Sequence, residues 1–175
     1  MKNGFLIAGC LIVAFLVQTG VLSAFGAYTM APDLLLVVLV PAAVLWQAPP
    51  VAFMGAAAGL MMDILFGQGV GLHAMAYCGF SWLIGSQGRR LFHENALIPA
   101  MMAGAAHVVT FLFAALMIFL GRMPIELSTE TLLKTLVSVL LTTGLTIPSY
   151  LAMFGYANRR VKSGTGVVTI SRLWR

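Results

Sequence analysis

Charged residues are scarce in this chain of 175 residues. They make up 9% of the chain, hydrophobic residues make up 61%, and the mean hydropathy is +0.99. A soluble globular domain carries roughly a quarter charged residues. The polar surface is therefore too small to face water on all sides. This excludes an ordinary soluble domain and favours an all-helical protein of the membrane.

Motifs that carry chemistry are also missing from the sequence. The two cysteines, Cys10 and Cys78, lie in apolar runs and are typical of packing residues, not of a disulfide framework. There is no CxxC or HExxH spacing and no phosphate-binding loop. The basic residues lack the spread of a nucleic-acid surface. We therefore expect no enzyme, no cofactor, no metal and no nucleic-acid partner.

Long apolar stretches are what the chain does contain. They cover approximately residues 5–25, 33–47, 50–66, 72–87, 97–120 and 131–156. A spanning helix needs roughly 20 apolar residues, and the middle three stretches fall short of this length. Two turns are expected between them, at Trp46–Pro50 with its paired prolines and at Gly67–Gly71. The pattern predicts one domain of about six transmembrane helices over residues 1–157 and a basic tail over 158–175.

The positions of the basic residues predict the orientation of these spans. With six spans and a cytoplasmic amino terminus, the outer loops hold only Arg122 and Lys134 of the ten Lys and Arg residues. This follows the positive-inside rule and places both termini in the cytoplasm. A cleaved signal peptide over residues 2–27 would leave five spans with the same remaining topology. The tail either adheres to anionic lipid headgroups or docks a cytoplasmic partner.

The stretch GAAAGLMMD places a carboxylate beside a GxxxG pair. In a helix Gly55, Gly59 and Asp63 share one face, and the glycines let another backbone come close. A carboxylate facing lipid costs several kcal/mol, so this face is expected to meet protein. Two interpretations stay open. Asp63 either locks helices or subunits or binds a ligand, or it lies at the outer end of its helix and reaches water.

Further polar residues lie near the ends of the predicted spans. Pro32 and Asp33 suit the first turn of a helix, where the macrodipole favours negative charge. His73 and Tyr77 begin a polar and small stripe with a four-residue repeat. In the six-span topology Asp33, Asp63 and His73 all lie near the outer surface. They can form one cluster, in which an aspartate and the histidine would be hydrogen-bonded.

The remaining polar residues predict contacts between helices. His107 shares one side of the fifth span with small residues, and Gln18 predicts an interhelical hydrogen bond. In the sixth span, the hydroxyls of residues such as Thr146 can cover the carbonyl group that Pro148 frees.

Two segments resemble the rod-shape-determining protein MreD family. They are APDLLL at 31–36 and GAAAGLMMDILFGQGVGLH at 55–73. That family shows a Pro-Asp near the second span, a glycine-rich span ending in Leu-Leu-Asp, then Gly-x-x-x-Gly and a small-residue helix. The matching positions are Pro32, Asp33, Gly59, Asp63, Gly67, Gly71 and His73. The chain departs from the family at Met61 and Met62, where leucines are usual.

The resemblance implies a non-catalytic inner-membrane scaffold or regulatory subunit of the bacterial cell-elongation (rod) complex. The implied partners are MreC, the glycosyltransferase RodA with its class B penicillin-binding protein, indirectly MreB, and membrane lipid. The family also resembles in fold the membrane substrate-binding component of energy-coupling-factor transporters. The alternative function is therefore a substrate-binding subunit of a vitamin-type transporter.

Candidate residues for partner or helix interfaces combine these patterns. They are Pro32, Asp33, Gly55, Gly59, Asp63, Gly67, Gly71, His73, Tyr77 and His107.

Overall fold

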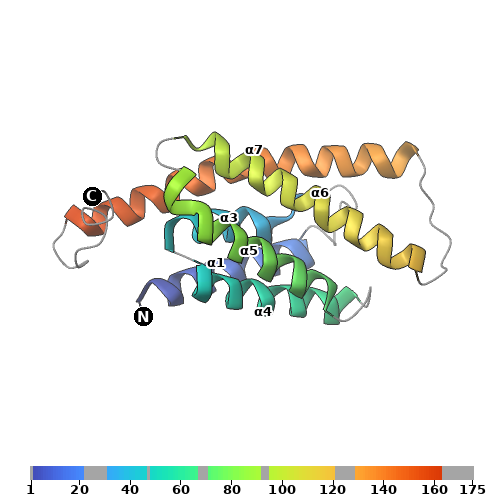
Figure 1. The fold of residues 1–175 in the computed structure, drawn as a ribbon, viewed down its shortest axis with the longest axis horizontal. Helices are drawn as coiled ribbons and strands as arrows, with labels where there is room; N and C mark the ends of the chain where they lie inside the picture. The colour runs from blue at the N-terminus through green and yellow to red at the C-terminus, as the bar shows by residue number, and fades with distance from the viewer. Residues whose placement is uncertain are drawn as a thin grey trace.

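The computed structural model is an all-helical bundle, as the composition predicts (Figure 1). It describes residues 2–21, 31–46, 48–66, 71–91, 95–120 and 129–162. The helices in chain order are α1 (Lys2–Leu16), extended by the π-helical turn η1 (Val17–Val21), α3 (Leu34–Trp46), α4 (Ala48–Phe66), α5 (Leu72–Leu91), α6 (Leu97–Leu120) and α7 (Thr129–Lys162).

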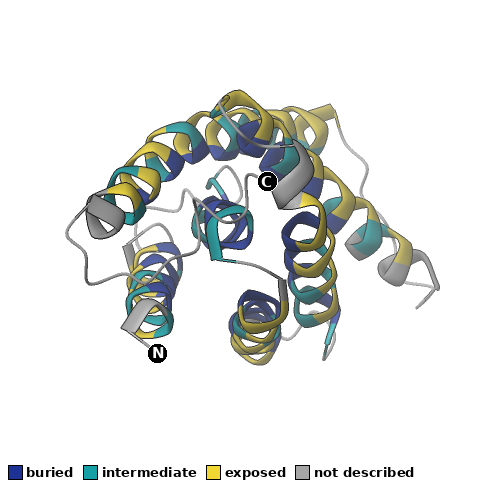
Figure 2. Cartoon of the chain, turned by 60° about the vertical axis from the view of Figure 1, so that its left-hand side comes forward, coloured by how far each residue is buried: buried dark blue, intermediate teal, exposed yellow. Residues whose placement is uncertain are grey.

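The outer faces of the bundle are apolar. Phe5, Phe53 and Ile64 each expose 70% or more of their surface, and Figure 2 shows exposed positions along the outward side of the helices. In the described part of the chain, the helix over Thr129–Asn158 is long and apolar enough to cross a membrane. Four shorter apolar helices accompany it there, over Gly4–Gly20, Leu34–Trp46, Pro49–Leu65 and Leu97–Phe113. The number of spans and the orientation of the termini stay predictions.

Helix α3 lies in the middle of the bundle (Figure 2). It packs against α1, α4, α5, α6 and α7. Its sequence is apolar on all sides, which is typical of a helix surrounded by others. Eight of its residues are buried: Leu35, Leu36, Val37, Leu39, Val40, Pro41, Ala42 and Ala43. This position explains how so short a helix is shielded.

Helix α3 contains a proline whose effect is offset by another helix. Pro41 has no N–H, so the carbonyl group of Val37 loses its partner within the helix. The hydroxyl of Ser149 in α7 donates to that carbonyl oxygen at 2.9 Å. The sequence predicts a similar role for hydroxyls near Pro148, which would cover the carbonyl group that this second proline frees. That prediction is wrong for Thr146. Pro148 frees the carbonyl group four residues before it, that of Gly144, but the Thr146 hydroxyl donates its one hydrogen to the Thr142 carbonyl.

Helices α4 and α5 approach each other closely through the predicted glycine face. A Cβ atom built on Gly55 would lie 2.9 Å from the Tyr77 carbonyl oxygen. One built on Gly59 would lie 2.5 Å from backbone atoms of His73 and Ala74. Any larger side chain would push the two backbones apart. The glycine face therefore serves a contact within the subunit.

Two boundaries differ from the sequence prediction. Helix α3 ends at Trp46 and α4 begins at Ala48. Pro49 and Pro50 therefore belong to the first helical turn of α4, whereas the sequence predicted that they lie in the connection between the two helices. Proline suits this position because the first N–H groups of a helix have no partner within it. Helix α7 continues to Lys162, past the predicted start of the basic tail. Residues 163–175 of that tail lie outside the described residues.

The glycine contact predicts an effect of a single methyl group. Gly59→Ala should lower the free energy of unfolding by about 1–3 kcal/mol, because the methyl group would overlap the α5 backbone. The matched control is Gly79→Ala, since a Cβ at Gly79 meets nothing within 4 Å. That variant should change stability by about 1 kcal/mol or less. Unfolding of both in detergent measures the difference, and equal stability would refute the close contact.

The hydrogen bond from Ser149 to the Val37 carbonyl predicts an energetic coupling between α7 and α3. Ser149→Ala should cost about 1–2 kcal/mol, because the Val37 carbonyl group loses its donor. In a Pro41→Ala background the new N–H can serve that carbonyl group, so the same substitution should cost less. A double-mutant cycle of unfolding free energies measures this coupling. If the two substitutions change the free energy of unfolding in a strictly additive way, Ser149 does not compensate for the N–H that Pro41 lacks.

Candidate functional site

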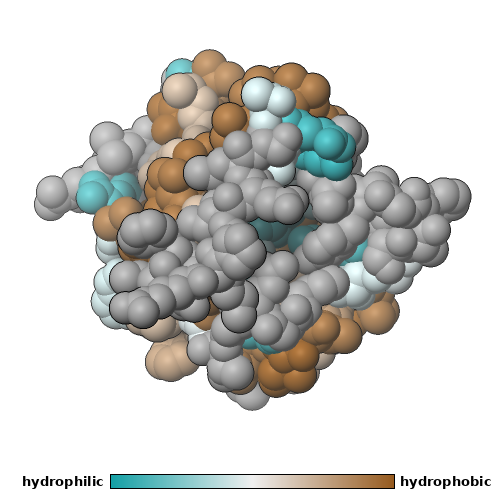
Figure 3. Space-filling view, turned by 90° about the vertical axis from the view of Figure 1, so that its right-hand side faces the viewer, coloured by the Kyte–Doolittle hydropathy of each residue, from teal (hydrophilic) through white to brown (hydrophobic). Residues whose placement is uncertain are grey.

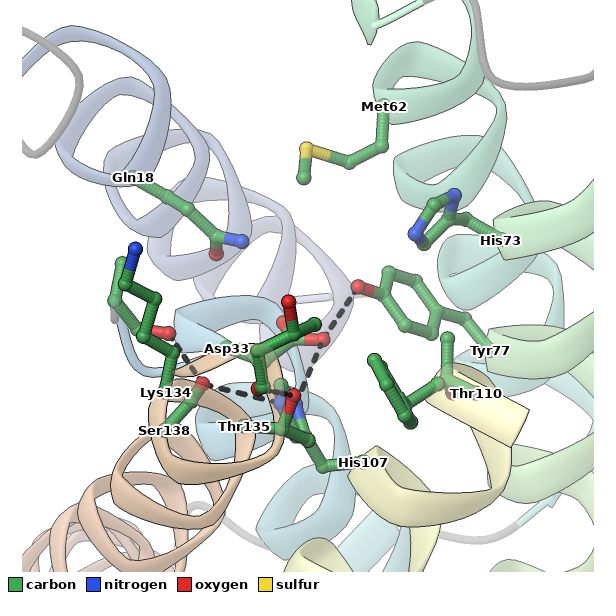
Figure 4. A pocket seen from close by; sticks show the side chains of 13 residues that line it. Gln18, Asp33, Met62, His73, Tyr77, His107, Thr110, Lys134, Thr135 and Ser138 are labelled. Carbon is green, nitrogen blue, oxygen red and sulfur yellow. Dashed lines mark hydrogen bonds and ion pairs between the residues drawn. The ribbon is translucent and has the colours of Figure 1, made fainter. Parts of the chain in front are cut away.

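Polar side chains converge at the end of the bundle where α3, α5 and α7 begin. They surround a cavity of about 430 Å³ whose lining includes Gln18, Asp33, His73, Tyr77, His107 and Ser138 (Figure 4). Figure 3 looks onto this end of the molecule, where a small hydrophilic area is visible near the centre and hydrophobic surface is visible toward the top and bottom of the view. The site therefore combines residues from η1, from the segment just before α3, and from α5, α6 and α7, together with Met62 of α4.

Asp63 holds the start of helix α5. Its Oδ2 accepts hydrogen bonds from the backbone N–H groups of Gly71 at 2.9 Å and Ala74 at 3.2 Å. Its Oδ1 accepts from the N–H of His73 at 3.0 Å and lies 2.8 Å from Nδ1 of the same residue. The first N–H groups of a helix have no partner within it, and a carboxylate satisfies them well.

The burial of Asp63 decides between the two interpretations of this residue. Asp63 is 2% exposed, so the interpretation in which it reaches water is wrong. Its observed contacts join the end of α4 to the start of α5 in the same subunit. Gly71 permits this turn with a φ of 100°, in the region that favours glycine.

Asp33 plays the corresponding part at helix α3. Its Oδ1 accepts from the Leu36 N–H at 3.2 Å, as expected of a residue at a helix start. Its own N–H donates to Oγ1 of Thr142 in α7 at 2.9 Å. The N–H group of Leu35 donates to Oε1 of Gln18 at 3.3 Å, which confirms the predicted interhelical bond. Three elements thus meet at the first turn of α3.

Tyr77 connects the two aspartate sites. Its hydroxyl donates to Oδ2 of Asp33 at 2.6 Å (Figure 4). Its ring meets the His73 ring edge to face, with centroids 5.8 Å apart. The expected hydrogen bond between an aspartate and His73 is present, at Asp63. The predicted cluster of Asp33, Asp63 and His73 therefore exists, and Tyr77 bridges it.

His107 approaches Asp33 from helix α6. The Ser138 hydroxyl donates its one hydrogen to the Ala31 carbonyl at 2.5 Å. It can therefore only accept from His107, whose Nε2 lies 3.1 Å away. This arrangement requires the hydrogen on Nε2. The other ring atom, Nδ1, is buried without a hydrogen bond and lies 3.8 Å from Oδ2 of Asp33.

The other candidate residues divide between this site and the α4–α5 contact. Pro32 is half-buried beside Asp33, and Gly67 lies outside the described residues. Lys134 was not among the predicted site residues, although it lines the cavity and pairs with Glu130 at 2.6 Å. Its four-residue spacing from Glu130 was the available signal. A role of any candidate in partner binding stays a prediction.

The arrangement holds helices together and offers hydrogen-bonding groups to a cavity. Among the residues that the structure describes, no group of three or more His, Cys, Asp or Glu side chains could hold a metal ion. The hydroxyl groups of Ser138, Thr142 and Tyr77 are donors in structural hydrogen bonds.

The contacts of Asp63 predict graded effects on stability. Asp63→Leu leaves three partly buried N–H groups without an acceptor and should cost about 3 kcal/mol or more. Asp63→Asn keeps one acceptor oxygen and should cost less. Ser86→Ala, at an exposed position of α5, is the control. Unfolding in detergent measures all three, and a Leu variant as stable as the parent would contradict the capping role.

The family model described as rod shape-determining protein MreD matches residues 1–157. No curated protein and no solved structure matches the chain. The likeness in fold to a transporter component is therefore not shown. Because the family match runs from the first residue into α7 and covers most of the sequence, the chain belongs to the MreD family of membrane proteins with a role in rod-shape determination.

Proposed function

We propose that this protein is a non-catalytic scaffold or regulatory subunit of the bacterial rod complex in the inner membrane. It would bind MreC and link it to RodA and the class B penicillin-binding protein, and indirectly to MreB. The observation that carries this proposal is the family match over residues 1–157. We further propose several membrane passages with both termini in the cytoplasm, because the basic residues are distributed in that way.

The use of the buried polar groups supports a scaffold. The carboxylate of Asp63 accepts hydrogen bonds from N–H groups at the start of α5, and that of Asp33 accepts one at the start of α3. Ser149 joins α7 to α3. Side chains that fix helices relative to one another give a surface of defined shape, and shape is what recognises another helix within lipid.

The outer faces supply apolar surface for such recognition. Each of four helices carries at least one large apolar side chain that is more than half exposed in the single chain. Examples are Ile12 in α1, Ile64 in α4, Met101 in α6 and Leu140 in α7. Lipid covers such side chains as well as protein does, so exposure alone does not locate the partner surface. A labelling experiment has to locate it.

The cavity is the observation that favours the alternative function, a substrate-binding subunit of a transporter. A volume of about 430 Å³ is within the range of small-molecule sites, roughly 300–1,000 Å³. The two functions differ in their protein partners, so one experiment separates them.

The test is photo-crosslinking in cells with a reactive residue at position 12, 64, 101 or 140. Purification in mild detergent and mass spectrometry then identify what is bound. We expect MreC and the RodA–penicillin-binding-protein pair, with one face labelled far more strongly than the others. Unirradiated cells are the control for each position.

Two results would contradict the proposal. A membrane coupling protein with paired ATPases among the crosslinked products would favour the transporter subunit. A reporter fused after Arg175 that is active outside the cytoplasm would refute the proposed orientation.

A further inference from the structure

The amide group of Gln18 brings hydrogen-bond donors into the cavity. Its Oε1 accepts from the Leu35 N–H, so the remaining end of the amide is the NH₂ group. Gln18 is 6% exposed and lines the cavity, and its Nε2 has no hydrogen bond to any residue that the structure describes. Among those residues, the one fully buried side-chain nitrogen or oxygen without a partner is Nδ1 of His107. Nε2 of Gln18 therefore keeps surface in the cavity.

Hydroxyl oxygens in the cavity wall are acceptors. The hydroxyl of Thr135 in α7 donates to the Thr131 carbonyl at 2.9 Å, and that of Thr110 in α6 donates to the Ala106 carbonyl at 2.9 Å. Both threonines line the cavity. A hydroxyl group has one hydrogen and two lone pairs, so these two oxygens can only accept from a ligand. The wall thus offers donors from η1 and acceptors from α6 and α7.

His73 adds a nitrogen that a hydroxyl group fits in either protonation state. Both oxygens of Asp63 already accept from backbone N–H groups, and Oδ1 lies 2.8 Å from Nδ1 of His73, so Nδ1 is the donor of that pair. The His73 side chain is 17% exposed and lines the cavity, and its Nε2 has no partner in the described part of the chain. Nε2 accepts from a ligand when the ring is neutral and donates when it is protonated.

We propose that this cavity binds a group with two neighbouring hydroxyls, as in glycerol or a sugar, between Gln18, Thr135 and His73. An ammonium group can only donate, and an ionised carboxylate or phosphate can only accept, whereas a hydroxyl group does both. Asp33 and His107 are not needed for this contact, because they lie at ion-pair distance from each other, with 3.8 Å between Oδ2 and Nδ1. The inference goes beyond the scaffold role and does not depend on it.

The volume and the lining of the cavity are compatible with such a ligand. About 430 Å³ is within the range of small-molecule sites. Figure 4 shows the amide nitrogen of Gln18 directed toward the space that His73 and Tyr77 face from the other side. Lys134 also lines the cavity, with a side chain that is 29% exposed, and can meet a phosphate joined to the hydroxyl-bearing group. The headgroup of phosphatidylglycerol and a soluble glycerol phosphodiester share this chemistry.

The test uses the full chain, purified without glycerol and in a detergent that has no sugar headgroup. Native mass spectrometry and thermal unfolding are recorded with phosphatidylglycerol and with phosphatidylpropanol of the same acyl chains. The two lipids carry the same charge, but the propyl headgroup lacks both hydroxyls. We expect roughly tenfold tighter binding of phosphatidylglycerol, because its hydroxyls form additional hydrogen bonds in the cavity.

A soluble competitor identifies the source of the ligand. Glycerophosphoglycerol has the headgroup of phosphatidylglycerol without its acyl chains. If it displaces phosphatidylglycerol, the site also takes soluble polyol phosphates. If it does not displace the lipid, and the preference between the two lipids is present, the site is specific for the lipid headgroup.

Variants connect the preference to the cavity wall. Gln18→Glu keeps an acceptor for the Leu35 N–H but removes the NH₂ donors, and it should reduce the preference to about threefold or less. The added charge affects both lipids alike, because their own charges are equal. Thr135→Val removes one acceptor and should weaken the preference to a similar degree. Thr19→Val is the matched control, because that hydroxyl donates to the Phe15 carbonyl in the same way and lies outside the cavity lining.

Two outcomes would overturn the proposal. If the parent protein binds phosphatidylglycerol and phosphatidylpropanol equally, the cavity holds no hydroxyl-bearing headgroup. If Gln18→Glu and Thr135→Val are both folded and keep the full preference, the hydroxyls bind elsewhere on the protein. Unfolding without lipid shows which variants are folded, and Thr135→Val decides alone if Gln18→Glu does not fold.

Discussion

The structure depends on satisfying the backbone N–H groups of helices that begin inside an apolar bundle. Lipid chains offer no hydrogen-bond acceptors and water is scarce there, so groups of the protein must accept these hydrogen bonds. Asp63 does this for α5 and Asp33 for α3. Each aspartate is buried, and each has a further side-chain contact, with the Tyr77 hydroxyl at Asp33 and with Nδ1 of His73 at Asp63. The two carboxylates therefore fix where the helices begin and how their ends lie together.

Close packing makes these hydrogen bonds possible. The absence of side chains at Gly55 and Gly59 brings the backbone of α4 onto the first turns of α5. This contact carries Asp63, one turn further along α4, to the N–H groups of residues 71, 73 and 74. Another hydrogen bond between helices is found at α3. There the Ser149 hydroxyl of α7 donates to the Val37 carbonyl, which the missing N–H of Pro41 leaves without a donor. Small residues and interhelical hydrogen bonds are the main sources of helix association in a membrane.

Membership of the MreD family places the protein in rod-shape determination. A bundle with a fixed interior and apolar outer faces suits a subunit that works by contact with other membrane proteins. The cavity at one end is lined in part by side chains that also join the helices, such as Asp33, Tyr77 and Ser138.

The sequence by itself determined the helical class, the approximate extent of the helices and the face shared by Gly55, Gly59 and Asp63. It also indicated that Asp33 starts a helix. These features follow from local composition and helical spacing, which a single stretch of chain contains. The tertiary structure alone decided that Asp63 is buried, that Ser149 serves the Val37 carbonyl group and that His107 faces Asp33. Those contacts join residues between 8 and 112 positions apart, and their geometry depends on how whole helices cross. Small residues and side-chain shape set these crossings, and no local pattern records them.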